Sequence, residues 1–177
     1  VVCPDLRGYG ASSKPPTDER HAPYAKRAVA QDVVEAMAQL GFDRFRLAGH
    51  DRGARVAHRL VLDHQERIEK VAILDIIPTR DVFRNVDQAV ATGTYHWFFL
   101  IQPAPYPETM IGHDPEYFLR WHLRAWSAGR DDFFDPVAVD AYVAAFSDPA
   151  TIHATCEDYR AGATIDLEHD DADIDTR

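Results

Sequence analysis

The sequence has little cysteine, no long hydrophobic run and fewer basic than acidic residues. Its 177 residues include only Cys3 and Cys156 and no Cys-x-x-Cys pair, which excludes a disulfide framework. We expect both to be free thiols in a reducing, cytoplasmic compartment. No apolar stretch approaches the roughly 20 residues that cross a bilayer, so we expect no membrane partner.

The charge balance bears on the kind of partner. Lys and Arg number 19 and Asp and Glu number 29, which gives a formal net charge of −10. This argues against a duplex nucleic acid as partner, because its phosphates require a basic protein face. A small anionic substrate is compatible with the charge, since a few arginines in a pocket can outweigh a distant acidic surface. Residues 166–177 contribute −5 of the total, so the remaining chain is only mildly acidic.

The apolar pattern of residues 1–79 predicts alternating strands and helices. We expect strands at 1–3, 44–48 and 71–77, and helices at 23–40 and 54–64. The third strand is an almost continuous apolar run, typical of a parallel strand buried on both faces. Strand–helix–strand–helix–strand at this spacing predicts an open α/β sheet with right-handed crossovers.

After Pro78 the pattern changes to helices rich in aromatic residues, with no strand-like run between 80 and 160. We interpret residues 1–79 as a partial core, 80–160 as a helical cap over the carboxyl edge of the sheet, and 161–177 as an acidic exit from the cap. The chain begins with Val1 inside an apolar stretch, so we interpret it as a fragment truncated before the final core strands. As an isolated fragment we expect it to be poorly stable and inactive.

The most informative segment is Gly49-His50-Asp51-Arg52-Gly53, between a predicted strand and a predicted helix. It matches the nucleophile elbow G-x-Nu-x-G, in which a strained turn raises the central side chain above the sheet. A carboxylate in this position attacks saturated carbon and leaves an ester on the enzyme. Asp51 could instead only cap the helix, which is worth about 1 kcal/mol. The flanking glycines and the preceding strand favour the elbow.

Five segments together carry a family resemblance: PDLRGYGASSKP, LAGHDRGARVAHRL, LDIIPT, YHWFF and CEDYRAG. The chain resembles the α/β-hydrolase superfamily, specifically its fluoroacetate (haloacetate) dehalogenase branch. GHDRGARV is the most specific part, because related epoxide hydrolases and haloalkane dehalogenases usually carry Trp where this chain has Arg52. The resemblance implies the α/β-hydrolase fold, here with a partial, mostly parallel sheet, an elbow and a helical cap. It implies no cofactor and is compatible with a homodimer.

The resemblance implies a role for each of seven residues. They are Asp51 as nucleophile, Asp75 as the acid that orients a catalytic His, Arg52 and Arg55 as the grip on the substrate carboxylate, and His96, Trp97 and Tyr159 as the halide pocket. The catalytic His and the loop that supplies an oxyanion-hole N–H have no match in residues 1–177. The other histidines show no paired ligand spacing on a helix, so we expect no metal site.

Each role has an ordinary structural alternative. The two arginines could form surface ion pairs with Asp63 or Glu66, although a cation beside the nucleophile also keeps it ionised. Asp75 interrupts an apolar strand, where a buried carboxylate without a partner would be costly, and it could hydrogen-bond a loop amide. The aromatic run YHWFF could be helix core alone.

We therefore expect hydrolytic dehalogenation of a short 2-haloacid through a covalent Asp51 ester, with a small anionic substrate and water as partners. One alternative is an epoxide hydrolase of the same superfamily, which would need Tyr acids facing Asp51. Another is a non-catalytic binding protein with this fold, against which the joint presence of Asp51, Arg52 and Arg55 argues.

Overall fold

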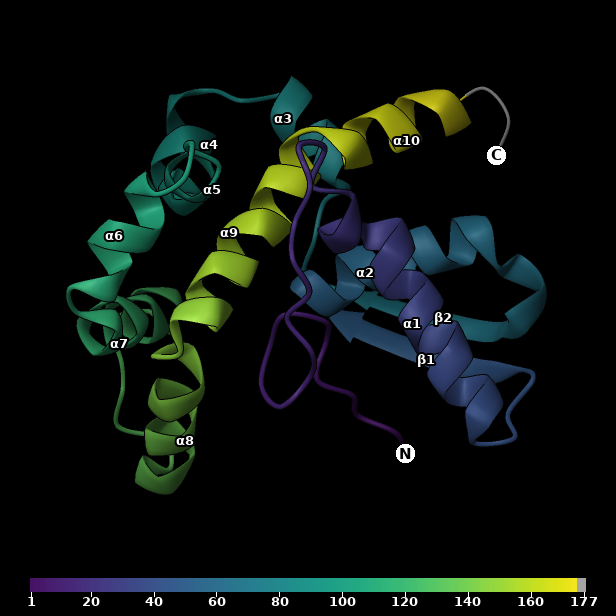
Figure 1. The fold of residues 1–177 in the computed structure, drawn as a ribbon, viewed down its shortest axis with the longest axis horizontal. Coiled ribbons are helices and arrows are strands. Elements are labelled where there is room, and N and C mark those ends of the chain that lie inside the picture. Colours follow the sequence, from purple (N-terminus) through teal and green to yellow (C-terminus); the bar gives the residue numbers. More distant parts are fainter. Residues whose placement is uncertain (175–177) are drawn as a thin grey trace.

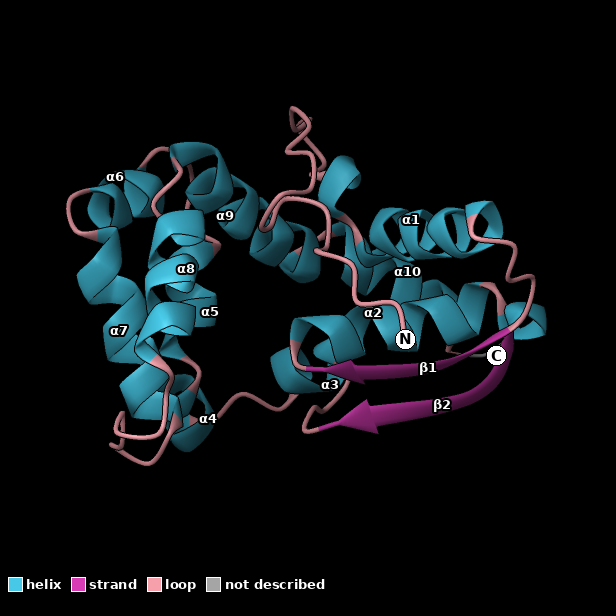
Figure 2. Ribbon diagram, turned by 90° about the horizontal axis from the view of Figure 1, so that it is seen from below, coloured by secondary structure: helices cyan, strands magenta, loops and turns pink. Residues whose placement is uncertain are grey.

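The computed structural model describes residues 1–174 and contains one sheet of two parallel strands. Strand β1 (Phe45–His50) pairs with β2 (Ile68–Leu74), and α2 (Arg52–Asp63) connects them. Helices α1 (Lys26–Gln39) and α2 lie on the same face of the sheet (Figure 2). Their apolar faces and β1 form one core, made of Val29, Ala30, Val34, Phe45, Val56 and Leu60.

The remaining elements are short helices, and their bounds follow in chain order. They are η1 (Ala22–Tyr24), η2 (Gln65–Arg67), α3 (Thr79–Arg84), α4 (Gln88–Gly93), α5 (Tyr95–Leu100), α6 (Tyr106–Gly112), α7 (Pro115–Trp126), α8 (Pro136–Phe146), α9 (Pro149–Ala163) and α10 (Ile165–Asp173). Among the described residues none of these helices is long and apolar enough to cross a membrane.

The order of strands and helices agrees with the prediction, but two features of the strands do not. Residues 1–3 are not a strand, because no described segment pairs with them. The strand predicted at 71–77 spans Ile68–Leu74 instead, since the chain turns at Asp75 with φ of 56°.

The predicted burial of this strand on both faces is also wrong. Val71, Ile73 and Leu74 are 42%, 41% and 49% exposed. Helices cover only one face of the two-stranded sheet, and β2 has no neighbour on its other edge among the described residues (Figure 2).

Helices α4–α8 form a separate layer on the far side of α9, which runs diagonally between them and the sheet with its two helices (Figure 1). No strand occurs between residues 80 and 160, as the sequence predicted. The core of this layer joins α5, α6 and α9 and consists of Trp97, Leu100, Ile111, Ile152, Cys156 and Tyr159.

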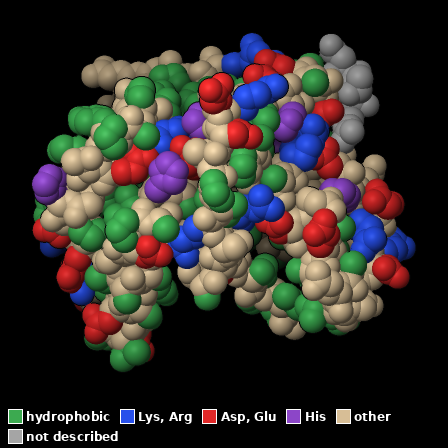
Figure 3. Space-filling view, in the orientation of Figure 1, with side chains coloured by type: hydrophobic (Ala, Val, Ile, Leu, Met, Phe, Trp, Pro, Cys, Tyr) green, Lys and Arg blue, Asp and Glu red, His purple; other side chains and the backbone are tan. Residues whose placement is uncertain are grey.

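The acidic residues after 161 are mostly paired with basic residues. Asp166 and Asp170 on α10 contact Lys26 and Arg59, and Asp171 contacts Arg84. Figure 3 shows acidic and basic side chains intermixed across this face of the molecule. The last three residues of the predicted acidic exit, 175–177, lie outside the described residues.

Candidate active site

Asp51 lies at the sharp turn where β1 ends and α2 begins. Its backbone has φ of 47° and ψ of −118°, a region that non-glycine residues occupy only under strain. Its side chain accepts no capping hydrogen bond from α2, so helix capping does not explain it. The turn instead presents the carboxylate outward at the amino-terminal end of α2, which is the geometry of a nucleophile elbow.

The two glycines of the elbow differ in what they permit. A Cβ atom at Gly49 would lie 2.5 Å from the carbonyl oxygen of Gly53, so β1 and α2 can approach this closely only with glycine there. A Cβ atom at Gly53 would meet nothing within 4 Å. Close packing of the elbow therefore depends on the first glycine of the motif and not on the second.

Asp51 faces an open cavity of about 740 Å³ at the carboxyl ends of the two strands. The core side of its lining includes Asp51, Arg55 and Asp75, and the cap side includes His96 and Trp97. The cavity thus brings together five of the seven predicted site residues. It lies where open α/β sheets bind ligands.

Asp75 follows β2 directly, and it is exposed where the sequence predicted burial. Its side chain is 92% exposed, so the predicted cost of a buried carboxylate does not arise. Its nearest ionic partner is His50, whose Nε2 lies 3.8 Å from Oδ2, and it makes no hydrogen bond to a loop amide among the described residues. Asp75 therefore points toward open space at the rim of the cavity.

Arg55 is buried in the cavity wall without a carboxylate partner in the described part of the chain. Its Nη1 donates to the carbonyl oxygen of Ile77 and to Oγ1 of Thr79, both at 3.0 Å, and its guanidinium lies 4.4 Å from the centre of the Trp97 ring. Burial and the nearby charge of Arg52 lower the pKa of Arg55 to about 10. A buried cation that is hydrogen-bonded only to neutral oxygens is suited to bind an anion from solution.

Arg52, which was expected to grip the substrate together with Arg55, already has a protein partner. Its Nε lies 2.6 Å from Oδ2 of Asp158, and its guanidinium lies 4.2 Å from the centre of the Tyr159 ring. A surface ion pair, the ordinary alternative for these arginines, does not describe their placement, because Arg55 is buried and Arg52 pairs with the buried Asp158. The structure thus distinguishes two arginines that look equivalent in sequence.

His96, Trp97 and Tyr159 form one cluster across α5 and α9. The Tyr159 ring lies edge-on to His96 at 5.8 Å and to Trp97 at 5.9 Å, and all three residues are buried. Burial, followed by the charges of His122 and Arg52, lowers the pKa of His96 to about 4, so the imidazole is neutral at pH 7. Its Nδ1 is buried without a hydrogen-bond partner among the described residues. Trp97 and Tyr159 also belong to the cap core, and Trp97 lines the cavity as well.

Sequence reasoning missed three residues around the site. Trp126 lines the cavity with its ring 5.0 Å from that of His96, and His122 packs beside both. Asp158 holds Arg52. The aromatic pattern indicated that Trp126 and His122 lie on a helix, but no spacing indicated which residues they would face.

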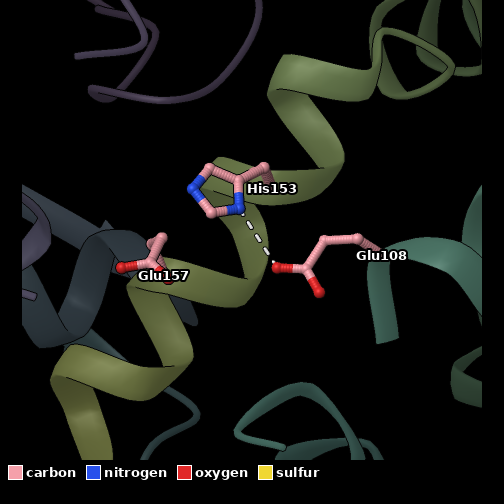
Figure 4. Close-up of side chains that lie close together, drawn as sticks. All are labelled: Glu108, His153 and Glu157. Atoms are coloured by element: carbon pink, nitrogen blue, oxygen red, sulfur yellow. Dashed lines mark hydrogen bonds and ion pairs between the residues drawn. The ribbon is translucent and has the colours of Figure 1, made fainter. Parts of the chain in front are cut away.

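One group among the described residues has the composition of a metal site, namely Glu108, His153 and Glu157. Figure 4 shows His153 and Glu157 on α9 facing Glu108 on α6. The Arg160 guanidinium already occupies the place of a cation, since its Nη1 lies 2.7 Å from Oε1 of both glutamates. We therefore assign no metal ion to this group.

Known proteins resemble this chain in both sequence and fold. It is 53% identical over 174 residues to a fluoroacetate dehalogenase of Burkholderia sp., covering 98% of this chain and 57% of the relative. It is 32% identical to a soluble epoxide hydrolase of Corynebacterium sp. (strain C12), covering 96% and 58%. The crystal structure of ALR0039 from Nostoc sp PCC 7120 superposes with a TM-score of 0.93 at 57% identity, covering 97% and 59%.

The chain spans a little more than half the length of these relatives. A family model described as alpha/beta hydrolase fold matches residues 1–170. The parallel strand pair, the elbow at Asp51 and the helical layer over the cavity agree with that match. The chain therefore belongs to the α/β-hydrolase fold family and, within it, resembles the fluoroacetate dehalogenase branch.

Proposed function

We propose that the full-length protein hydrolyses a short 2-haloacid to the corresponding hydroxy acid. The observation that carries this proposal is Arg55, a buried cation whose hydrogen-bond partners within residues 1–174 are neutral oxygens, in the same cavity as Asp51. A guanidinium in this state favours a substrate that brings its own carboxylate. The 53% identity to a fluoroacetate dehalogenase supports the same substrate class.

In the first step, a carboxylate oxygen of Asp51 attacks the carbon that bears the halogen. A carbon–oxygen bond forms, the carbon–halogen bond breaks, and the halide leaves with the bonding electrons. Arg55 holds the substrate carboxylate so that the carbon faces Asp51. His96 and Trp97, on the cap side of the cavity, offer N–H groups to the departing halide.

In the second step, water attacks the carbonyl carbon of the Asp51 ester. The ester bond breaks, the hydroxy acid is released and Asp51 regains its carboxylate. The balance is one water consumed and one halide and one proton released. We propose that a histidine outside residues 1–177 takes the proton from water, and that Asp75 at the cavity rim orients it.

The test is turnover of fluoroacetate by the full-length protein in water enriched in heavy oxygen. Attack of water on the ester carbonyl places heavy oxygen in the Asp51 carboxylate, which peptide mass spectrometry detects. We expect the label at Asp51 in the active protein and neither label nor turnover in Asp51→Asn. Turnover that leaves Asp51 unlabelled through many cycles would exclude the ester mechanism.

The second candidate function is epoxide hydrolysis, favoured by the identity of 32% to a soluble epoxide hydrolase. Epoxide opening needs tyrosine hydroxyls that face the nucleophile. The Tyr95 hydroxyl lies 3.1 Å from Nε2 of His122, and the Tyr159 ring lies beneath Arg52. Turnover of styrene oxide in preference to fluoroacetate would favour this function, and substrate binding without either turnover would favour a binding protein.

The proposal extends to the setting of the enzyme. We propose a cytoplasmic homodimer whose partners are a small anionic substrate and water, as the family resemblance suggests. Light scattering of the full-length protein tests the dimer, and cell fractionation tests the compartment.

A further inference from the structure

Thr79 is a buried polar residue at the start of α3, and it is not among the residues that line the cavity. Its hydroxyl oxygen accepts a hydrogen bond from Nη1 of Arg55 at 3.0 Å. The carbonyl oxygen of Ile77 accepts a second bond from the same nitrogen, also at 3.0 Å. Two acceptors that follow β2 in the chain thus fix one end of a guanidinium in the cavity wall.

The methyl group of Thr79 faces a different element, helix α9. A Cβ atom at Gly162 would lie 4.0 Å from Cγ2 of Thr79, which is ordinary van der Waals contact. The hydroxyl and the methyl group of one side chain therefore meet α2 and α9 respectively. Because χ1 of a β-branched residue is restricted, the packing of the methyl group favours the rotamer that presents the hydroxyl to Arg55.

Helix α3 is also held in place independently of Arg55. Arg80 and Arg84 on α3 both pair with Asp171 on α10. The position of the Thr79 hydroxyl thus depends on contacts with α9 and α10. It is a fixed acceptor for the arginine and does not depend on the arginine for its own placement.

The guanidinium of Arg55 is left with free donors on one side. It carries five N–H groups in one plane, and the two acceptors engage those of Nη1. Nε is buried without a hydrogen-bond partner among the described residues. The Trp97 ring, 4.4 Å away, further restricts the group. With Nη1 engaged, Nε and Nη2 form the edge that remains for a carboxylate to bind.

The charges near Arg55 do not set its orientation in this way. Those of Arg52, Asp51 and Asp158 all act on it. Within residues 1–174, however, no carboxylate accepts a hydrogen bond from its guanidinium. Its direction is therefore set by Thr79 and the Ile77 carbonyl, whereas the surrounding charges set only its electrostatic energy.

We propose that Thr79 is a positioning residue for Arg55, whose hydroxyl holds Nη1 so that the other donors of the guanidinium are directed to the substrate carboxylate. This inference rests on the proposed function, since it concerns the carboxylate site of that reaction. It holds whether Arg55 binds the carboxylate alone or together with Arg52. It makes anion binding depend on a residue outside the cavity lining.

The two groups of the Thr79 side chain can be removed separately. Thr79→Val keeps the shape and the methyl group but removes the hydroxyl, so Nη1 keeps one acceptor and a buried N–H loses its partner. The guanidinium is then less well oriented, and a small carboxylate binds more weakly. Thr79→Ser keeps the hydroxyl and loses only the methyl contact with α9. If Thr79 served packing alone, the serine variant would be the more damaging of the two.

The experiment measures the Kd of acetate by calorimetry, and kcat and KM for fluoroacetate by fluoride release, in the full-length protein. We expect Thr79→Val to weaken acetate binding and to raise KM by about fivefold or more, and Thr79→Ser to stay within about twofold of the wild type. Thr155→Val is the matched control, because Thr155 is also 8% exposed and its hydroxyl donates to the carbonyl oxygen of Thr151 within α9. It should change neither quantity by more than about twofold.

A second comparison tests whether Thr79 acts through Arg55. When Thr79→Val is added to Arg55→Leu, it should weaken acetate binding by less than about twofold further, because the group that it positions is absent. The same fivefold loss in this background would overturn the proposal. If Thr79→Val does not fold, Thr79→Ala replaces it, since alanine and serine differ only in the hydroxyl at this position.

Two other results would overturn the proposal. One is an acetate Kd of Thr79→Val within twofold of the wild type, and the other is equal weakening in Thr79→Val and Thr79→Ser. The acetate measurement needs no turnover. A wild type that releases no fluoride but shows the expected order of acetate affinities would therefore refute the proposed function alone, whereas fluoride release with an unchanged acetate Kd in Thr79→Val would refute this inference alone.

Discussion

Replacing Arg55 by leucine should abolish most of the discrimination in favour of anionic substrates. The side chain lies in the cavity wall and is held by two neutral oxygens at 3.0 Å, so its charge is available to a substrate carboxylate. A charge-assisted hydrogen bond contributes about 1.5–3 kcal/mol, which corresponds to a rise of about one to two orders of magnitude in KM for fluoroacetate. Because the same contact aligns the carbon with Asp51, kcat should fall as well.

The assay is fluoride release by the full-length protein with fluoroacetate and with neutral fluoroacetamide. The wild type should turn over the acid and scarcely touch the amide, since a desolvated guanidinium left without an anion is itself penalised. Arg46→Leu is the matched control, because it removes a positive charge from an exposed position on β1, where Arg46 pairs with Glu69. It should change KM by less than twofold.

Two results would refute this reasoning. Unchanged kinetics of Arg55→Leu on fluoroacetate would show that Arg55 does not hold the substrate carboxylate. An equal rise of KM in Arg55→Leu and Arg46→Leu would show that net charge alone steers the substrate, whatever the position of the arginine.

Three further predictions concern the elbow and the aromatic cluster. Gly49→Ala should destabilise the protein by more than about 3 kcal/mol, because its Cβ would lie 2.5 Å from a backbone oxygen. Gly53→Ala, where the Cβ would meet nothing within 4 Å, should change stability by less than about 1 kcal/mol. Thermal unfolding of both variants measures the difference, and equal effects would contradict the close approach of β1 and α2 at Gly49. His96 has a folded-state pKa of about 4 against 6.5 ordinarily, so the unfolded chain binds more protons between these values and stability falls as the pH falls through this window. Urea unfolding should show about 2 kcal/mol of destabilisation from this group between pH 7.5 and 5, absent in His96→Gln, and an identical loss in that variant would be the contrary result. Trp97→Phe keeps most of the apolar volume but removes the indole N–H, so it should slow turnover of fluoroacetate more than turnover of chloroacetate. The control Trp121→Phe, at an exposed position, should affect turnover of neither substrate. Equal slowing of both substrates by Trp97→Phe would show that Trp97 has a packing role alone.

The sequence predicted those features that depend on local pattern. The strand, glycine and Asp51 in succession were sufficient to predict the elbow, because a positive φ and a close strand–helix approach are properties of a few adjacent residues. The helices of the cap were likewise predicted from their aromatic and apolar spacing.

The sequence could not predict features that depend on contacts between distant segments. Arg52 and Asp158 are 106 positions apart, and nothing near either residue indicates the pair. The sequence also failed to predict the exposure of β2. Its apolar run is suited to a strand covered on both faces, but the run does not show whether covering elements are present. The apolar residues around Asp75 in the sequence suggested that it is buried. In the structure the chain changes direction at Asp75, after β2 ends, and its side chain is exposed.

Helix α9 has an unusual consequence for how this protein tolerates insertions and deletions. Four successive residues, Glu157 to Arg160, face four different surroundings: the loop at His21, the buried charges at Arg52, the aromatic cavity wall, and α6. Adding or removing one residue earlier in the helix would rotate this quartet by about 100°, so that every member would face the wrong neighbour at once. The chain length between Pro149 and Glu157 is therefore under tighter constraint than the identity of most residues within it.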